Sequence, residues 1–169
     1  MKGKIIIPAI ITIFSFLGVT YTACIKDNCT SSLCANGGIC VNGACACVTG
    51  YEGAHCDTLW SQKFSGAWKV AEATQDANGV TESGYTITVG PSTTGNVFLI
   101  SRLENSQDSI YCTLNDNISF LVPIQSNADS TFYIQSGEGA LDTTTGIVTM
   151  NYSYLQNGVS RTSTLTWTR

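Results

Sequence analysis

The chain has 169 residues, of which 12% are charged, and its formal net charge is −4. An acidic chain with so few charges lacks the basic surface that holds a phosphate backbone, which excludes nucleic-acid binding as a first hypothesis. The length accommodates an export signal, one very small module and one domain of about 110 residues. The small share of charged residues is typical of an exported β protein.

Residues 1–23 have the pattern of a signal peptide. A positively charged start precedes an apolar run over 5–19, which is shorter than the roughly 20 residues of a membrane-spanning helix. The segment ends in Thr22 and Ala23, directly before Cys24. Small residues in front of a cysteine resemble the bacterial lipobox, and this resemblance implies that Cys24 is lipidated and becomes the mature N-terminus.

Ordinary secretion is the alternative to lipidation. In that case the signal peptide is cleaved without lipid attachment, and Cys24 stays free or pairs with Cys112. Two acyl chains on Cys24 would hold the protein stably at a membrane, since one chain alone binds only marginally.

Six of the eight cysteines lie within residues 29–56. A segment this short cannot bury enough apolar surface to fold unaided, so disulfides or a metal ion must hold it. The spacings do not form the paired Cys-x2-4-Cys pattern of zinc sites, and the single histidine is His55. Disulfides are therefore expected, but the spacing alone leaves their connectivity open.

The motifs within this segment resemble an epidermal-growth-factor-like (EGF-like) module. Asn36-Gly37-Gly38 precedes the third cysteine, a Cys-x-Cys pair follows, and Gly50-Tyr51-x-Gly53 precedes the last cysteine. We assign the module to 24–57. The stretch before the first cysteine lacks the oxygen ligands of calcium-binding members, so no metal or cofactor is expected. The resemblance implies the pairs Cys29–Cys40, Cys34–Cys45 and Cys47–Cys56.

After a linker at 58–65, the segment 66–169 alternates apolar and polar residues with a period of two, as β-strands do. Turn residues separate the alternating runs, and Asn157-Gly158 is the pair typical of a type I′ hairpin. The run over 118–124 would place Ile118, Phe120, Val122 and Ile124 on one face. The expected strands contain Trp68 and Val70, then residues 85–89, 96–103, 110–114, 118–124, 132–134, 147–155 and 159–168.

About eight strands joined by short turns predict an antiparallel up-and-down barrel, with a Greek-key β-sandwich as the alternative. The opening Gly66-x-Trp68 resembles the first-strand motif of lipocalins and related calycin barrels. That resemblance implies that an arginine late in the last strand, Arg161 or Arg169, packs over Trp68 and closes the barrel. The segment is shorter than a typical lipocalin, which argues against a large internal cavity.

No motif of a known catalytic centre occurs in the chain, and we expect no enzymatic activity. His55 is expected to face solvent, and Cys112 alternates with Ile110 and Leu114 on a predicted core face. The carboxylates of the β segment are scattered, mostly near predicted turns: Glu72, Asp76, Glu82, Glu104, Asp108, Asp116, Asp129, Glu138 and Asp142.

Together these features predict a non-enzymatic, lipid-anchored protein at a bacterial outer membrane or cell surface, in which an EGF-like spacer presents a β domain for binding. EGF-like modules behind a lipobox are most similar to lipoproteins of the Bacteroidetes type. The expected partners are the membrane, through the lipid on Cys24, and a protein, glycan or small apolar ligand, but no nucleic acid. The alternatives are a lipocalin-like carrier of a small apolar ligand and a secreted EGF-like signalling ligand.

Overall fold

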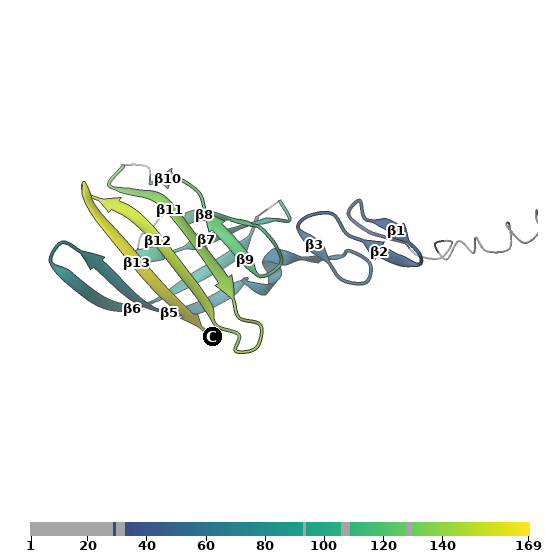
Figure 1. The fold of residues 1–169 in the computed structure, drawn as a ribbon, viewed down its shortest axis with the longest axis horizontal. Helices are drawn as coiled ribbons and strands as arrows, with labels where there is room; N and C mark the ends of the chain where they lie inside the picture. The colour runs from purple at the N-terminus through teal and green to yellow at the C-terminus, as the bar shows by residue number, and fades with distance from the viewer. Residues whose placement is uncertain (1–28, 30–32, 93, 106–108, 128–129) are drawn as a thin grey trace, which may run out of the picture.

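The computed structural model describes residues 29, 33–92, 94–105, 109–127 and 130–169. They form a small N-terminal module and a larger β barrel, which Figure 1 shows end to end. The predicted signal peptide and Cys24 lie outside the described residues, so lipidation and secretion both stay predictions. Within the described ranges, no helix is long and apolar enough to cross a membrane.

The N-terminal module is held by three disulfides, which are the pairs that the EGF-like resemblance implies: Cys29–Cys40, Cys34–Cys45 and Cys47–Cys56. Its first hairpin turns at Asn42 and Gly43, both at positive φ (52° and 88°), the geometry of a two-residue turn of type I′. His55 is exposed, as expected. The strands of the module are β1 (Ile39–Val41), β2 (Ala44–Ala46), β3 (Tyr51–Glu52) and β4 (Thr58–Leu59).

The segment 58–65, which we predicted as a linker, is ordered and joins the two units. It contains β4 and a 3-10 helix, η1 (Trp60–Lys63), and Phe64 directly after η1 is fully buried in the barrel. Phe64 packs in parallel on Phe98 (ring centroids 5.1 Å apart) and edge-on against Phe120 (5.5 Å). The burial of Phe64, with Trp60 packed against the same cluster, makes this segment part of the core.

The module is docked on one end of the barrel by polar and backbone contacts. Oε1 of Glu52 lies 2.8 Å from the Lys63 ammonium, and Asn117 Nδ2 donates a 2.8 Å hydrogen bond to Glu52 Oε2. Partial burial acts to raise the pKa of Glu52, but Lys63 and Asn117 outweigh it and lower the pKa. Gly50 approaches Gly95 so closely that a Cβ on Gly50 would lie 2.7 Å from the Gly95 carbonyl carbon.

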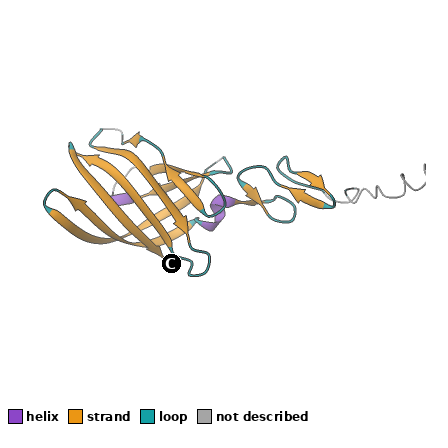
Figure 2. Cartoon of the chain, in the orientation of Figure 1, coloured by secondary structure: helices purple, strands orange, loops and turns teal. Residues whose placement is uncertain are grey.

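The second unit is an eight-stranded antiparallel barrel with up-and-down order (Figure 2). Each strand pairs with the next along the chain, β9 pairs with β11, and β13 pairs with β5 to close the sheet. The predicted barrel is therefore confirmed and the Greek-key sandwich is wrong. Short β10 extends the pairing of β11, and η2 follows β7. The elements are β5 (Gly66–Asp76), β6 (Gly79–Pro91), β7 (Val97–Ser101), η2 (Leu103–Asn105), β8 (Ser109–Leu114), β9 (Ser119–Val122), β10 (Gln125–Ser126), β11 (Phe132–Leu141), β12 (Val148–Gln156) and β13 (Val159–Thr168).

The strand over 118–124 is shorter than predicted. β9 covers Ser119–Val122, so Phe120 and Val122 point inward, but Ile118 and Ile124 are 37% and 62% exposed. Pro123 follows directly and has no N–H to continue the ladder, which ends the strand there. Alternation alone overestimated the strand because apolar residues continue past its end.

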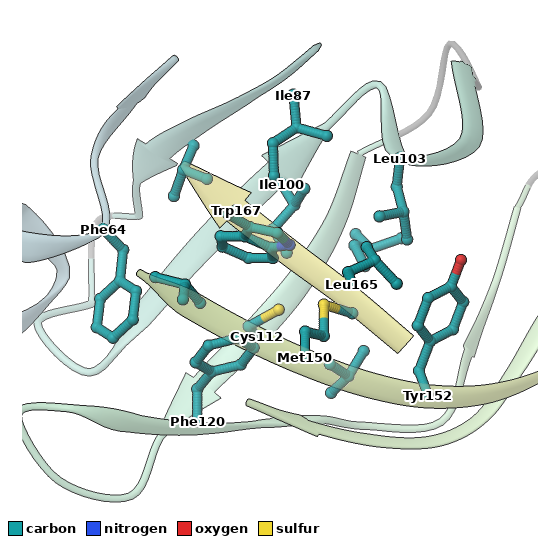
Figure 3. Close-up of a cluster of buried hydrophobic side chains, with 14 of the residues drawn as sticks. Phe64, Ile87, Ile100, Leu103, Cys112, Phe120, Met150, Tyr152, Leu165 and Trp167 are labelled. Atoms are coloured by element: carbon teal, nitrogen blue, oxygen red, sulfur yellow. The ribbon is translucent and has the colours of Figure 1, made fainter. Parts of the chain in front are cut away.

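The half of the barrel nearest the module is filled by aromatic rings. Trp68 and Trp167 lie 6.2 Å apart, and Phe120 packs 5.8 Å from Trp167. Figure 3 shows Phe64, Phe120 and Trp167 gathered at one side of the core, with Tyr152 at the other. We refer to this end as the base of the barrel and to the opposite end as the distal end.

An arginine covers Trp68 at the base. The guanidinium carbon of Arg169 lies 4.6 Å from the Trp68 ring centroid, and its Nη2 donates to the carbonyl oxygens of Lys63 and Ser65 (3.1 and 3.4 Å). Arg161, the other residue predicted to cover Trp68, does not do so, because it lies near the distal end beside Asp76. It precedes Arg169 by eight residues, and at about 3.3 Å per residue the strand carries it roughly 25 Å away.

Strand β11 approaches its neighbours closely through glycines. A register shift between Ile134 and Ser136 changes the phase of the strand, so that Gly137 and Gly139 occupy inward positions. A Cβ on Gly139 would lie 2.2 Å from Cζ of Phe120. The Phe120 ring therefore occupies the space that any larger residue at 139 would need.

Replacing Gly139 by alanine is expected to destabilise the barrel by about 1–3 kcal/mol, because the Phe120 ring must leave its packed position. Gly90→Ala is the matched control, since a Cβ on Gly90 meets nothing within 4 Å. Urea unfolding of both variants measures the difference. Equal stability of Gly139→Ala and Gly90→Ala would contradict this packing.

The free thiol of Cys112 is fully buried in the core, as its alternation with Ile110 and Leu114 predicted. Burial raises the pKa of this thiol well above its ordinary value, so the thiolate is suppressed. We therefore expect iodoacetamide to label Cys112 slowly in the native protein and rapidly in urea, with peptide mapping to assign the label. Fast labelling without denaturant would contradict the burial of Cys112.

Candidate ligand-binding site

A polar pocket of about 240 Å³ opens at the distal end of the barrel. It lies among the end of β5, the start of β6, η2 and the start of β13, whereas the module contacts η1 and the opposite ends of the strands. In Figure 1 the β5–β6 hairpin accordingly projects away from the module. The lining residues are Glu72, Thr74, Asp76, Thr81, Ser83, Tyr85, Glu104 and Arg161.

The inward positions change from apolar to polar along the barrel. On β5, Trp68 and Val70 are followed in the same phase by Glu72, which is 3% exposed. On β12, Val148 and Met150 are followed by Tyr152 and Tyr154, which are also buried. The same alternation that builds the aromatic base thus places acids and phenols inside the distal half.

Glu72 is surrounded by hydroxyl donors. The Tyr85 hydroxyl donates to Oε2 of Glu72 at 2.6 Å, and the Tyr152 hydroxyl lies 3.0 Å from Oε1. Thr74 Oγ1 is 3.4 Å from the same Oε1 and 2.6 Å from the Ser163 hydroxyl. Both oxygens of this buried carboxylate are therefore hydrogen-bonded, as burial requires.

Glu104 in η2 joins the same network from the other side of the pocket. Its Oε1 accepts a hydrogen bond from Tyr154 and lies 3.3 Å from the Tyr152 hydroxyl, while Gln156 Nε2 is 3.5 Å from Oε2. One hydroxyl, that of Tyr152, therefore bridges the two carboxyl groups. The backbone of Glu104 is left-handed (φ 50°), a conformation that costs a non-glycine residue free energy and is held here by these contacts.

The charge of Glu72 influences the protonation of Glu104. Burial raises the pKa of Glu104, the hydrogen bond from Tyr154 partly offsets the shift, and the negative charge of Glu72 raises the pKa further. Burial and the Glu104 hydrogen bond raise the pKa of Tyr154 to about 12, and burial with the charge of Glu72 raises those of Tyr85 and Tyr152. The phenols therefore remain hydrogen-bond donors to the carboxyl groups.

The rim of the pocket carries one weak ion pair. Nη2 of Arg161 lies 3.9 Å from Oδ2 of Asp76, near the limit of an ion pair. Nε of Arg161 is buried and has no hydrogen-bond partner among the described residues. The pocket therefore combines the buried carboxyl group of Glu72 and the partly buried ones of Glu104 and Asp76 with an N–H that has no acceptor among the described residues.

This site was not predicted from the sequence. Glu72 and Glu104 were placed among scattered carboxylates near turns, but the barrel brings them together across 32 residues of sequence. One signal was present, because Glu72 lies in phase with Trp68 and Val70 and so had to point inward. The predicted disulfide cysteines lie in the module. Of the residues predicted for barrel closure, Trp68 and Arg169 lie at the base, whereas Arg161 lines the pocket.

The site suits hydrogen bonding and charge recognition. In the part of the chain that the structure describes, no group of three or more histidine, cysteine, aspartate or glutamate side chains is placed to hold a metal ion. Small polar ligands of matching size and charge are the molecules that such a pocket can hold.

Comparison with known proteins identifies the N-terminal module. The family model of the EGF-like domain matches residues 26–56, the segment that contains the three disulfides. No curated protein matches the chain. An EGF-like module joined to an antiparallel barrel fits a non-enzymatic binding or interaction protein.

Replacing Glu104 by glutamine is expected to stabilise the protein at neutral and alkaline pH. Because folding raises the pKa of Glu104, its contribution to stability is complete below the pKa of the unfolded chain and is lost as pH rises through the folded pKa. Glutamine keeps an oxygen for the tyrosines, offers an N–H toward Glu72, and cannot ionise. Melting temperatures near pH 4 and about pH 8 measure the effect, with the variant gaining on the wild type only at the higher value.

Comparing wild type with Glu104→Gln cancels the effects of other titrating groups on the melting temperature. Backbone and side-chain hydrogen bonds lower the pKa values of Asp116 and Asp142, which favours folding as pH rises, but both residues are common to wild type and variant. Glu138→Gln, on the outer face of β11, is the matched control and should show no pH-dependent gain. A Glu104→Gln difference that is equal at both pH values would contradict the raised pKa.

Proposed function

We propose that this protein is a non-enzymatic, lipid-anchored binding protein of a bacterial cell surface, of the Bacteroidetes type. Lipid on Cys24 would hold the N-terminus at the membrane, and the disulfide-linked module would act as a spacer. The observation that carries this proposal is the position of the pocket, which opens at the end of the barrel opposite the docked module. A spacer attached to the base points the binding end away from the anchor.

The contacts at the base support a stiff spacer. Glu52 binds both Lys63 and Asn117, and Gly50 packs against Gly95. Three disulfides restrict the module itself, which is too small to be stabilised by a hydrophobic core. The barrel would therefore be presented in a defined orientation.

A polar ligand fits the interior better than the apolar ligand of a lipocalin-like carrier. The base is filled by aromatic rings that pack directly against one another: Phe64, Phe98, Phe120, Trp68 and Trp167. The distal half is lined by carboxyl and hydroxyl groups, and an apolar molecule would remove these from water without replacing their hydrogen bonds.

The lipid anchor is tested by Cys24→Ala. The wild-type protein is expected in the membrane fraction and to incorporate labelled palmitate, whereas the variant is expected to lose the label and leave the membrane. Cys112→Ala is the matched control, because it removes the other cysteine outside the three disulfides and should keep both properties.

Mass spectrometry of the mature N-terminus adds an independent measurement. A diacylated Cys24 as first residue supports the anchor, and an unmodified N-terminus supports a secreted protein, including an EGF-like signalling ligand. A Cys24→Ala variant that stays membrane-bound would exclude the lipid anchor.

A further inference from the structure

The β1–β2 hairpin of the module presents an apolar face to solvent. Four apolar side chains share this face, because antiparallel pairing joins residues that point the same way: Ile39 with Ala46 and Val41 with Ala44. All four are exposed, and the two largest, Ile39 and Val41, are 65% and 48% accessible. Exposed apolar side chains that lie side by side are typical of a surface that contacts another molecule or a membrane.

The opposite face of the hairpin is occupied by disulfides. Cys40 and Cys45 pair with each other across the two strands and alternate with the exposed apolar residues. Cys40 is bonded to Cys29, and Cys45 is bonded to Cys34. The covalent core of the module therefore lies behind the hairpin, and the apolar face cannot turn inward to find cover there.

The module has an uncharged end and a charged end. Residues 28–51 contain no Asp, Glu, Lys or Arg, whereas Glu52 lies in β3 and Asp57 directly precedes β4. Glu52 forms its ion pair with Lys63 at the base of the barrel. Figure 1 shows β1 and β2 at the end of the module that is farther from the barrel. A surface without charges avoids the large desolvation cost that a charged group would meet in lipid.

The proposed lipid anchor is close to this hairpin along the chain. Cys24 precedes Cys29 by five residues, which span at most about 18 Å when fully extended. Cys29 is bonded to Cys40 in the middle of β1, with 5.7 Å between the two Cα atoms. A lipid on Cys24 would therefore keep the hairpin within reach of the membrane surface.

We propose that the apolar face of the β1–β2 hairpin lies against the lipid bilayer beside the anchor, with Ile39 and Val41 at the boundary between head groups and acyl chains. The contact adds to the binding by the acyl chains, since apolar area removed from water contributes in proportion to its size. A lipid on Cys24 is a single point of attachment, about which the protein tilts. A second contact through the hairpin restricts this tilt and turns the distal pocket away from the membrane.

Quenching of tryptophan fluorescence by brominated phospholipids tests the contact. The lipidated full chain is placed in vesicles of brominated phosphatidylcholine as wild type, as Val41→Trp and as Val80→Trp. Val80 is the matched control, because it is a valine that is 63% exposed and lies beside the β5–β6 turn, away from the module. We expect most of the emission added at residue 41 to be lost and the emission added at residue 80 to remain, while the three native tryptophans are common to all samples.

Transfer between vesicles measures what the contact contributes to membrane binding. Ile39→Glu is expected to speed the transfer of the lipidated protein from donor to acceptor vesicles about tenfold, because the isoleucine side chain no longer leaves water for lipid. Val80→Glu should transfer at the rate of the wild type. Both substitutions are at exposed positions, so the module and the barrel are expected to stay folded.

This inference rests on the proposed lipid anchor, and the two fail in different ways. A chain without lipid that stays off the vesicles would overturn both. A lipidated, vesicle-bound chain whose residue 41 is not quenched would overturn the hairpin contact alone and would assign the face to a protein partner. Equal transfer rates of Ile39→Glu and Val80→Glu would also overturn it.

A second copy of the chain is the remaining occupant to test. In solution, the double variant Cys24→Ala with Val41→Trp is expected to be a monomer with the emission of a water-exposed indole. Blue-shifted emission together with the mass of a dimer would assign the apolar face to a second copy and contradict the membrane contact.

Discussion

Closure of the sheet is the constraint on which the rest of this structure depends. Pairing of β13 with β5 and of β9 with β11 forces every inward side chain into one enclosed space, which must be filled without voids or clashes. At the base the space is filled by aromatic rings, and one of them fits because residue 139 has no side chain. The inward positions near the distal end are polar instead and line a pocket of about 240 Å³.

The same enclosure explains why the distal carboxyl groups interact. Glu72 on β5 and Glu104 in η2 share the hydroxyl of Tyr152, and neither can turn outward without breaking hydrogen bonds to buried phenols. Water would screen two such groups on an outer surface, but burial makes their repulsion stronger and raises the pKa of Glu104. The site is therefore sensitive to charge because it is part of the interior.

Local patterns predicted much of the fold, and long-range geometry decided the rest. Cysteine spacing with glycine motifs indicated the module, and alternation with Asn157-Gly158 indicated antiparallel strands, since these features depend on near neighbours in sequence. The meeting of Glu72 with Glu104 depends on which strands become neighbours, which alternation does not reveal. The register shift in β11 also has no sequence signature here, although it decides that Gly139 rather than Glu138 faces the core.

The order of the two units gives the barrel a direction. Phe64 fills the base from within, Arg169 covers Trp68 there, and the module occupies the surface beside Asn117. A molecule approaching from that side meets packed rings and the docked module, whereas the distal side offers hydroxyls and carboxyl groups. Because β5 runs from Trp68 at the base to Asp76 at the rim, one strand connects the closed end to the open one. Sequence order thus places the N-terminal module and the distal pocket at opposite ends of the barrel.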